Sequence, residues 1–139
     1  MIKKENGFTL IELLIVIVVL GILVSIAVPG LTGVKKRADL AVVKSDLHNI
    51  MHSLELYYLD NESYPVQSTA SSLSAVAEDL DDLKLKKSAE NYQYQTDSAS
   101  ESSGADKYLV YYETEDSKFY YTSTEEASVA GPAETAPAI

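Results

Sequence analysis

The sequence predicts an α+β protein in which a long N-terminal helix, membrane-embedded in its first half, packs against a small antiparallel β-sheet head. Three observations carry this prediction. An uncharged apolar run occupies residues 13–34. An apolar stripe at helical spacing follows over residues 40–57. Three short segments rich in tyrosine, a residue that favours strands, lie further towards the C-terminus.

The apolar run contains no Asp, Glu, Lys, Arg or His between Leu13 and Val34. As a helix it is roughly 33 Å long at about 1.5 Å per residue, which matches the bilayer hydrocarbon thickness of roughly 30 Å. A cleaved secretory signal would be shorter and would end at a small-residue site, and the sequence after Pro29 offers no such site. We therefore expect a membrane span that stays attached. Basic residues flank it on both sides, so charge alone leaves its orientation open.

Composition excludes several classes of function. The 139 residues include 11 Lys or Arg and 21 Asp or Glu, for a net charge of −10 and no cysteine. The acidic balance argues against nucleic-acid binding, and the lack of cysteine excludes disulfides and thiolate chemistry. The sequence shows no nucleophile–base pair, no phosphate-binding loop and no paired carboxylates in a catalytic context. We therefore expect a protein without enzymatic activity.

Two features are unusual for a simple membrane anchor. Glu12 lies at the start of the apolar block, and a carboxylate at mid-membrane costs about 2.5–3.5 kcal/mol. Near the end of the span the cost is smaller, and the simplest explanation is an end residue that reaches the interface. Pro29 interrupts the helical hydrogen-bond ladder, and Gly21 and Gly30 are further weak points.

The N-terminal segment Lys3-Lys4-Glu5-Asn6-Gly7-Phe8-Thr9-Leu10-Ile11-Glu12 resembles the prepilin processing motif of type IV pilins and pseudopilins. The resemblance covers residues 1–60 well and the rest in general architecture. It implies that a prepilin peptidase cuts between Gly7 and Phe8 and methylates the new amine of Phe8. It also implies that Glu12 pairs with the Phe8 amine of a neighbouring subunit and so sets the register of assembly, the best-attested use of a buried ion pair. By the same resemblance, the helix melts or kinks at Gly21 and Pro29 in the filament.

The resemblance and the residue pattern together divide the chain into five parts. We expect a cleaved leader at 1–7, a transmembrane and filament-core helix at 8–34, an amphipathic continuation of the helix at 35–60, a globular α/β head at 61–126 and a flexible tail at 127–139.

The function implied is that of a structural, major-pilin-like subunit of a type IV pilus filament, polymerised through its N-terminal helix. The implied partners are other copies of the chain, prepilin peptidase, a membrane platform protein, an assembly ATPase and minor pilins. The subunit would sit in the cytoplasmic membrane, N-terminus inside, before it joins an extracellular pilus. Twitching motility, adhesion, DNA uptake and secretion all remain open.

Two alternative functions stay open. The first is a pseudopilin of a type II secretion or competence system. The lack of cysteine favours it, or a pilin of a Gram-positive anaerobe, because many Gram-negative major pilins close a disulfide loop. The second is a signal-anchored extracytoplasmic binding protein, which would need neither the Gly7-Phe8 pair nor Glu12.

The helix beyond the membrane has two distinct faces. Its apolar stripe, which we expect to pack on the head, consists of Leu40, Val43, Leu47, Ile50, Leu54 and Tyr57. Leu56 and Leu59 lie away from this stripe, and we interpret them as candidates for contacts between subunits. His48 and His52 are at the i and i+4 spacing that can bind metal, but no third ligand is near in sequence, so we predict no metal site.

The head begins where residues 60–65 end the helix. We predict a second helix over residues 73–83, capped by Ser71 or Ser72, then strands at 92–96, 107–113 and 118–122, with a hairpin turn at 115–117. The acidic loop from Asp97 to Asp106 could hold calcium, as major pseudopilins do, but it lacks EF-hand spacing. We favour a solvated loop there and expect no cofactor.

Overall fold

One long helix and one antiparallel sheet form most of the regular structure in the residues that are described, 8–98, 104–126 and 128–139. The computed structural model gives these elements in chain order: α1 (Leu10–Asn61), β1 (Ser71–Ser72), the short 3-10 helices η1 (Leu73–Ala75) and η2 (Ala89–Asn91), β2 (Gln93–Thr96), β3 (Tyr108–Glu113), β4 (Phe119–Ser123) and β5 (Ala130–Ala133). The predicted α+β class is confirmed. The chain divides into two units, Met1–Asp39 and Leu40–Ile139.

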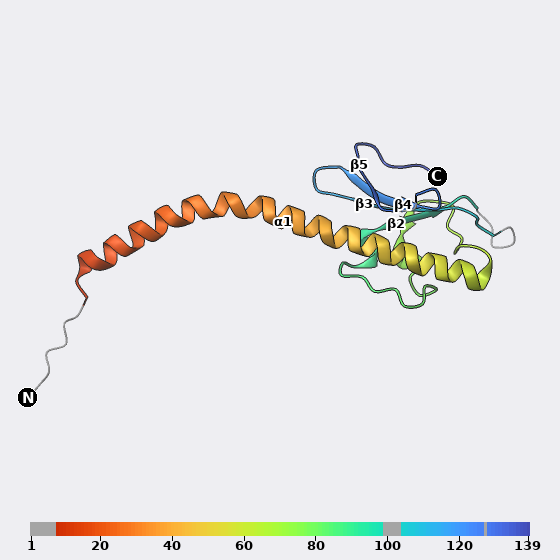
Figure 1. The fold of residues 1–139 in the computed structure, drawn as a ribbon, viewed down its shortest axis with the longest axis horizontal. Helices are drawn as coiled ribbons and strands as arrows, with labels where there is room; N and C mark the ends of the chain where they lie inside the picture. The colour runs from red at the N-terminus through yellow and green to blue at the C-terminus, as the bar shows by residue number, and fades with distance from the viewer. Residues whose placement is uncertain (1–7, 99–103, 127) are drawn as a thin grey trace, which may run out of the picture. The chain divides into compact units, whose positions relative to one another are not determined.

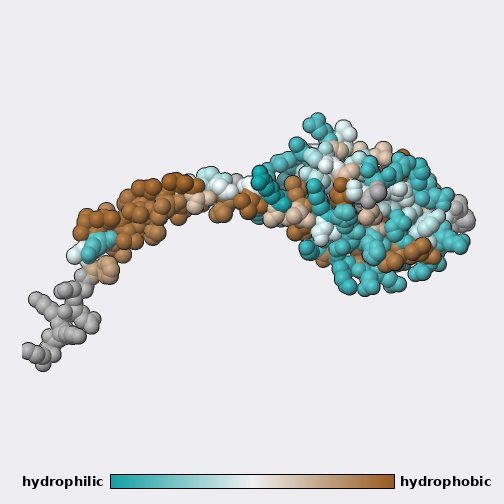
Figure 2. All heavy atoms as spheres, in the orientation of Figure 1, coloured by the Kyte–Doolittle hydropathy of each residue, from teal (hydrophilic) through white to brown (hydrophobic). Residues whose placement is uncertain are grey.

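In the first unit, α1 exposes its apolar side chains all around its circumference. Leu14 is 46% exposed and Ile26 is 72% exposed, although both are strongly apolar. The most apolar 18-residue window has a mean hydropathy of 3.1, and none of it is buried inside the protein. Figure 2 shows this stretch as an apolar surface. By length and composition the helix can cross a membrane, as the sequence predicts.

In the second unit, the remainder of α1 lies along one face of the sheet (Figure 1). The predicted apolar stripe forms this contact: Val43, Leu47, Ile50 and Leu54 are at most 1% exposed. The opposing side of the core consists largely of tyrosines from the strands and from the segment after the helix, Tyr64, Tyr92, Tyr94, Tyr108 and Tyr120. The helix face and the aromatic sheet face therefore bury each other.

The sheet is a meander with strand order β1-β2-β3-β4-β5, antiparallel throughout. Val110 is opposite Tyr94 on one side and Thr122 on the other, and all three side chains are buried on the face that meets α1. The strands begin and end within one residue of the three predicted segments. The predicted hairpin turn is confirmed, because the Thr114 amide donates to the Lys118 carbonyl oxygen across it.

Helix α1 ends where the sequence predicts. The Asn61 side-chain amide donates to the Tyr57 carbonyl oxygen at 2.9 Å, and Glu62 follows with a left-handed φ of 57°, as is common after a helix C-terminus. Tyr64 and Pro65 then turn back into the core and are buried.

The predicted second helix over residues 73–83 is wrong. Ser72 does cap a helical turn by accepting from the Ser74 amide, but only η1 forms and turns follow it. Leu73, Val76 and Leu80 are buried as a helix would bury them. Four acidic residues at 78, 79, 81 and 82 would repel each other at i, i+3 and i+4 on a helix, so the segment keeps its apolar contacts without helical structure.

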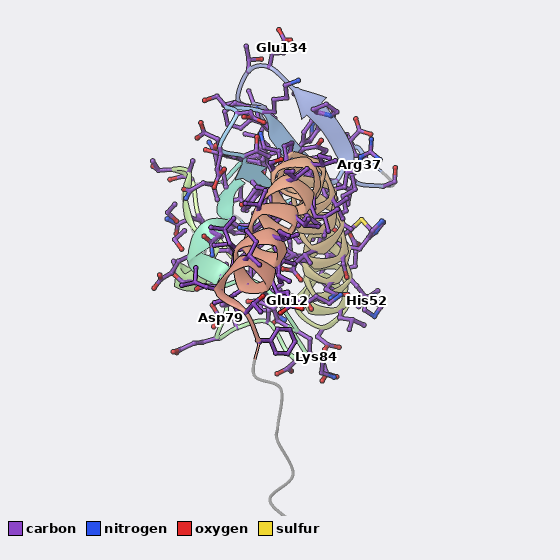
Figure 3. The ribbon with its side chains drawn as sticks, turned by 90° about the vertical axis from the view of Figure 1, so that its left-hand side faces the viewer. Glu12, Arg37, His52, Asp79, Lys84 and Glu134 are labelled. Atoms are coloured by element: carbon purple, nitrogen blue, oxygen red, sulfur yellow. The ribbon has the colours of Figure 1, made fainter. Side chains whose placement is uncertain are left out.

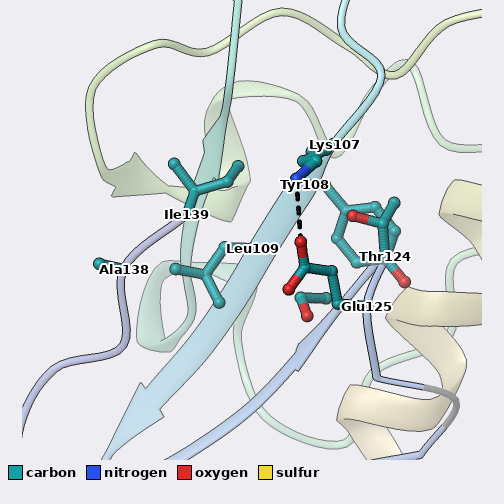
Figure 4. Close-up of a pocket in the computed structure, with 8 residues that line it drawn as sticks. Lys107, Tyr108, Leu109, Thr124, Glu125, Ala138 and Ile139 are labelled. Atoms are coloured by element: carbon teal, nitrogen blue, oxygen red, sulfur yellow. Dashed lines mark hydrogen bonds and ion pairs between the residues drawn. The ribbon is translucent and has the colours of Figure 1, made fainter.

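The prediction of a flexible tail over 127–139 is also wrong for most of the segment; Ala127 itself lies outside the described residues. Residues 130–133 form edge strand β5, in which Ala133 pairs with Phe119 and Ala130 with Tyr121. The chain then returns over the outer face of the sheet, where Ala138 and Ile139 lie beside Leu109 (Figure 4). The backbone hydrogen bonds of an edge strand need no apolar period in the sequence, so pattern analysis missed it.

Candidate functional site

The N-terminal end of α1 is built as a capping box around Glu12. One oxygen of the Glu12 carboxylate, Oε2, accepts from the Thr9 amide at 2.8 Å and from the Thr9 hydroxyl at 2.7 Å. The Thr9 hydroxyl oxygen in turn accepts from the Glu12 amide at 3.3 Å. Such reciprocal bonds satisfy two of the free amides that every helix N-terminus carries. Glu12 therefore has local partners, and its second oxygen, Oε1, takes no part in these bonds.

The predicted cleavage site lies between Gly7 and Phe8, and Phe8 is the first residue that the structure describes. Gly7 lies outside the described residues, and the Phe8 side chain is 87% exposed. Phe8 is four residues before Glu12 in the chain, and both are at the start of the exposed apolar stretch. Cleavage after Gly7, methylation of Phe8 and the register role of Glu12 all stay predictions.

The two positions where we predict melting or kinking are helical in this single chain. Gly21 and Pro29 both lie inside α1, which continues through them to Asn61. A Cβ at Gly21 would meet no atom within 4 Å, so nothing in the isolated subunit requires glycine there. The predicted melting concerns the assembled filament and stays a prediction.

The outward face of α1 in the second unit carries the candidate contact residues. Leu56 is 39% exposed and Leu59 is 75% exposed, away from the core stripe. His48 and His52 are exposed on the same side of the helix, and Figure 3 shows His52 directed outward from it. These four side chains are available to a partner, and the role of Leu56 and Leu59 as subunit contacts stays a prediction.

A structurally important residue that our sequence analysis missed is Asp46. Its side chain is completely buried and accepts three hydrogen bonds, from the Lys86 amide at 2.9 Å, the Lys87 amide at 2.9 Å and the Tyr92 hydroxyl at 2.8 Å. Nearby, the Asn49 side-chain amide donates to the Lys84 carbonyl oxygen at 2.9 Å. The two side chains fix the irregular segment before β2 against the helix.

A signal for Asp46 was present in the sequence. The residue lies three positions after Val43 and four before Ile50, so helical periodicity places it on the apolar stripe itself. A carboxylate at such a position must find donors, because an unpaired buried charge is expensive.

Burial and neighbouring carboxylates also raise the pKa values of two tyrosines in the head. Burial, and then the hydrogen bond to Asp46, raises the pKa of Tyr92 well above its usual value. Burial again raises the pKa of Tyr64, with a further contribution from the hydroxyl bond to Glu55 at 3.0 Å. Both phenols therefore stay neutral donors in the folded head.

The loop that we weighed as a calcium site begins at Asp97. Its Oδ1 accepts from the Asp106 amide at 3.2 Å and the Lys107 amide at 3.1 Å, which closes the base of the loop. Residues 99–103 lie outside the described residues. In the described part of the chain, no group of three or more His, Cys, Asp or Glu side chains is arranged to hold a metal ion.

Two family models match this chain in adjacent segments. The prokaryotic N-terminal methylation motif matches residues 2–28, and the model of type II secretion system protein G matches residues 30–124. The first covers most of the apolar stretch of α1 with its capping box. The second covers the remainder of α1 and the head through β4, which is more than half of the chain.

Individual relatives agree with the family models. Type II secretion system core protein G of Klebsiella pneumoniae is 48% identical over 63 residues, 45% of each chain. The protein of the same name from Escherichia coli K12 is 37% identical over 89 residues, 64% of this chain and 61% of the relative. The matched region thus spans about half the length of these relatives. No solved structure is significantly similar to the chain. Together, the helix, the head and the two matching models show that this chain belongs to the type II secretion system protein G family, within the pilin-like proteins.

Proposed function

We propose that the chain is a non-catalytic structural subunit of a short secretion filament, a pseudopilus, built by polymerisation through α1. The observation that carries this proposal is the apolar half of α1, which the subunit leaves exposed on every side. Such a surface suits both lipid and neighbouring helices. The N-terminal methylation motif and the protein G family model favour a filament subunit over a simple anchored binding protein. The family membership supports secretion over the long surface pilus.

The assembly step exchanges one apolar environment for another. In the membrane, the side chains of the span contact lipid, and the backbone amides and carbonyls hydrogen-bond to one another within the helix. In the filament, the same side chains would contact neighbouring helices. Lipid and helix surfaces are similarly apolar, so packing and polar pairing must supply the specificity. The chain shows no phosphate-binding loop, so we propose that a separate ATPase and platform protein drive extraction.

Glu12 would supply the polar pairing. Its Oε2 is held by Thr9, while Oε1 would face the free amine that cleavage creates on Phe8 of the neighbouring subunit. An ion pair in an apolar setting has one favourable alignment, because a shift along the axis leaves both charges unpaired. Thr9 would hold the carboxylate in place until that amine arrives.

The first experiment is intact mass spectrometry of the protein from filaments of cells that overproduce the subunit. We expect a chain that begins at Phe8 and carries one additional methyl group. Gly7→Ala should leave the uncut chain in the membrane, while Gly33→Ala, the same change at a glycine with open space around it, should be processed normally. A filament protein that begins at Met1 would reject the proposal.

A second experiment separates processing from assembly. Glu12→Ala should be cleaved and methylated like the parent chain but should form few filaments, scored by electron microscopy of cells that overproduce the subunit. Glu90→Ala, an exposed carboxylate of the head, is the matched control and should leave filament number unchanged. Normal filament number in Glu12→Ala would remove the register role.

A long type IV pilus remains the second candidate, because the methylation motif over residues 2–28 is the part of the chain that resembles pilins and pseudopilins alike. Filament length in the native host distinguishes the two. Loss of secretion without loss of surface motility, in cells that lack the gene, would support the pseudopilus.

A further inference from the structure

We propose that His48 and His52 form a two-imidazole chelate for a divalent transition-metal ion of the zinc and copper class, on the outward face of α1. The proposal concerns only the second unit and is independent of the filament role. It differs from the sequence-based prediction of no metal site, and it rests on the exposure of both histidines in the structure.

The helix supplies the geometry of the pair. Residues at i and i+4 have Cβ atoms about 5–6 Å apart on the same face, the spacing by which paired histidines on one helix bind zinc. His48 and His52 lie well inside α1, eight or more residues from its C-terminal end at Asn61. Both are exposed, and within the described residues neither imidazole has a hydrogen bond or an ion pair. The two nitrogens are thus held near each other by the backbone and remain free to bind.

The charged neighbours on the same face are engaged elsewhere. The ammonium of Lys44, four residues before His48, lies 5.5 Å from the centre of the Tyr120 ring, which holds it against the sheet. The Glu55 carboxylate, three residues after His52, accepts from the Tyr64 hydroxyl at 3.0 Å through Oε1, and in the described residues it does not join the two histidines in a group that could hold a metal ion. We therefore assign the two imidazoles as the protein ligands and water to the remaining positions. The net charge of −10 favours the approach of any cation.

The ligand type decides the class of metal. Neutral imidazole suits zinc, copper and nickel, whereas calcium and magnesium require oxygen ligands. Two protein ligands with open positions make a site weaker than a closed structural zinc centre, which has four.

The test uses the full chain in detergent micelles and zinc alone as the probe, followed by isothermal titration calorimetry. We expect one zinc ion per chain, and the two variants His48→Gln and His52→Gln should each bind at least about tenfold more weakly. Removing a ligand must cost no less than removing its outer-shell partner, which costs about 10- to 100-fold. Glu55→Gln is the matched control and should bind as the parent does. Far-UV circular dichroism checks that each variant keeps its helix, which glutamine favours.

Two further measurements distinguish the imidazoles from the many carboxylates of the chain. Excess calcium should leave zinc binding unchanged, and the electron paramagnetic resonance spectrum of bound Cu²⁺ should show coupling to two nitrogen nuclei. The proposal is overturned if both histidine variants bind zinc as the parent does, if calcium displaces the zinc, or if the Cu²⁺ spectrum of the parent is unchanged in the double variant.

Discussion

Replacement of Asp46 by alanine tests whether one buried carboxylate holds the irregular part of the head. The substitution leaves three donors without their acceptor, namely the part-buried amides of Lys86 and Lys87 and the buried hydroxyl of Tyr92. A buried donor without a partner costs about 1–3 kcal/mol. The loss is partly offset because a desolvated carboxylate is removed and water can reach part of the site. We expect the free energy of unfolding to fall by roughly 3–5 kcal/mol.

Such a loss is large relative to the total stability of a small domain, about 5–15 kcal/mol. The assay is urea unfolding of the full chain in detergent micelles, followed by the near-UV circular dichroism of the tyrosines, all ten of which lie beyond the apolar span. Tyr92→Phe removes only one bond to a charged acceptor and should cost about 1.5–3 kcal/mol. Asp81→Asn, at an exposed position of the same segment, should change stability by no more than about 0.5 kcal/mol.

The slope of the free energy of unfolding against urea concentration reports how much surface becomes exposed on unfolding. An unchanged slope in Asp46→Ala would mean that the same surface unfolds from a less stable head, and a reduced slope would mean that the segment before β2 is already detached in the native state. If Asp46→Ala unfolds at the same urea concentration as Asp81→Asn, the three hydrogen bonds contribute nothing to stability and our reasoning is refuted.

Three further predictions follow from other parts of the structure. Burial raises the pKa of Tyr108 to about 12, so the contribution of the neutral phenol to stability is complete below the unfolded pKa of about 10 and is lost as the pH rises. Absorbance at 295 nm should show this tyrosine ionising only as the head unfolds. A titration in one step near pH 10 without unfolding would contradict this. Gly131→Ala should detach β5, because φ there is +112° and a Cβ would lie 2.5 Å from the Phe119 carbonyl oxygen. Rapid amide hydrogen exchange in β5 would confirm the detachment, and exchange as slow as in the parent protein would contradict it. Thr9→Val removes the hydroxyl that bonds Glu12 and should cost the first turn of α1 about 1 kcal/mol, seen as faster amide exchange there; unchanged exchange would show that the cap adds nothing.

Much of the fold follows from local patterns. The uncharged run before Val34 and the stripe from Val43 to Leu54 define both halves of α1, because helix periodicity is a local property of the chain. The tyrosine-rich composition of three segments likewise places β2, β3 and β4 within one residue. The helix, β2 and β4 bury a single face, which imposes a repeat on their residues, whereas β3 was found by its composition because Tyr108, Leu109 and Val110 are all buried.

Residues whose conformation depends on distant partners were not predictable in the same way. The segment over 73–83 has helical apolar spacing but forms no second helix. The chain directly after it is held by bonds of Lys84 to Asn49 and of Lys86 to Asp46, residues more than thirty positions earlier. Strand β5 is defined by its pairing with β4 and by Gly131, and its four small residues show no period.

The sequence by itself determined the apolar helix, the resemblance of its N-terminus to prepilins and the side of the helix that meets the head, because each depends on residues within a few turns of one another. The tertiary structure decided which side chains have partners. The bond between Glu12 and Thr9 is local to the first turn of α1, but distant residues enclose Asp46 in three donors and leave His48 and His52 unengaged in solvent. The physical reason is that burial and hydrogen bonding are properties of the folded surroundings, and residues that are distant in the chain supply most of those surroundings.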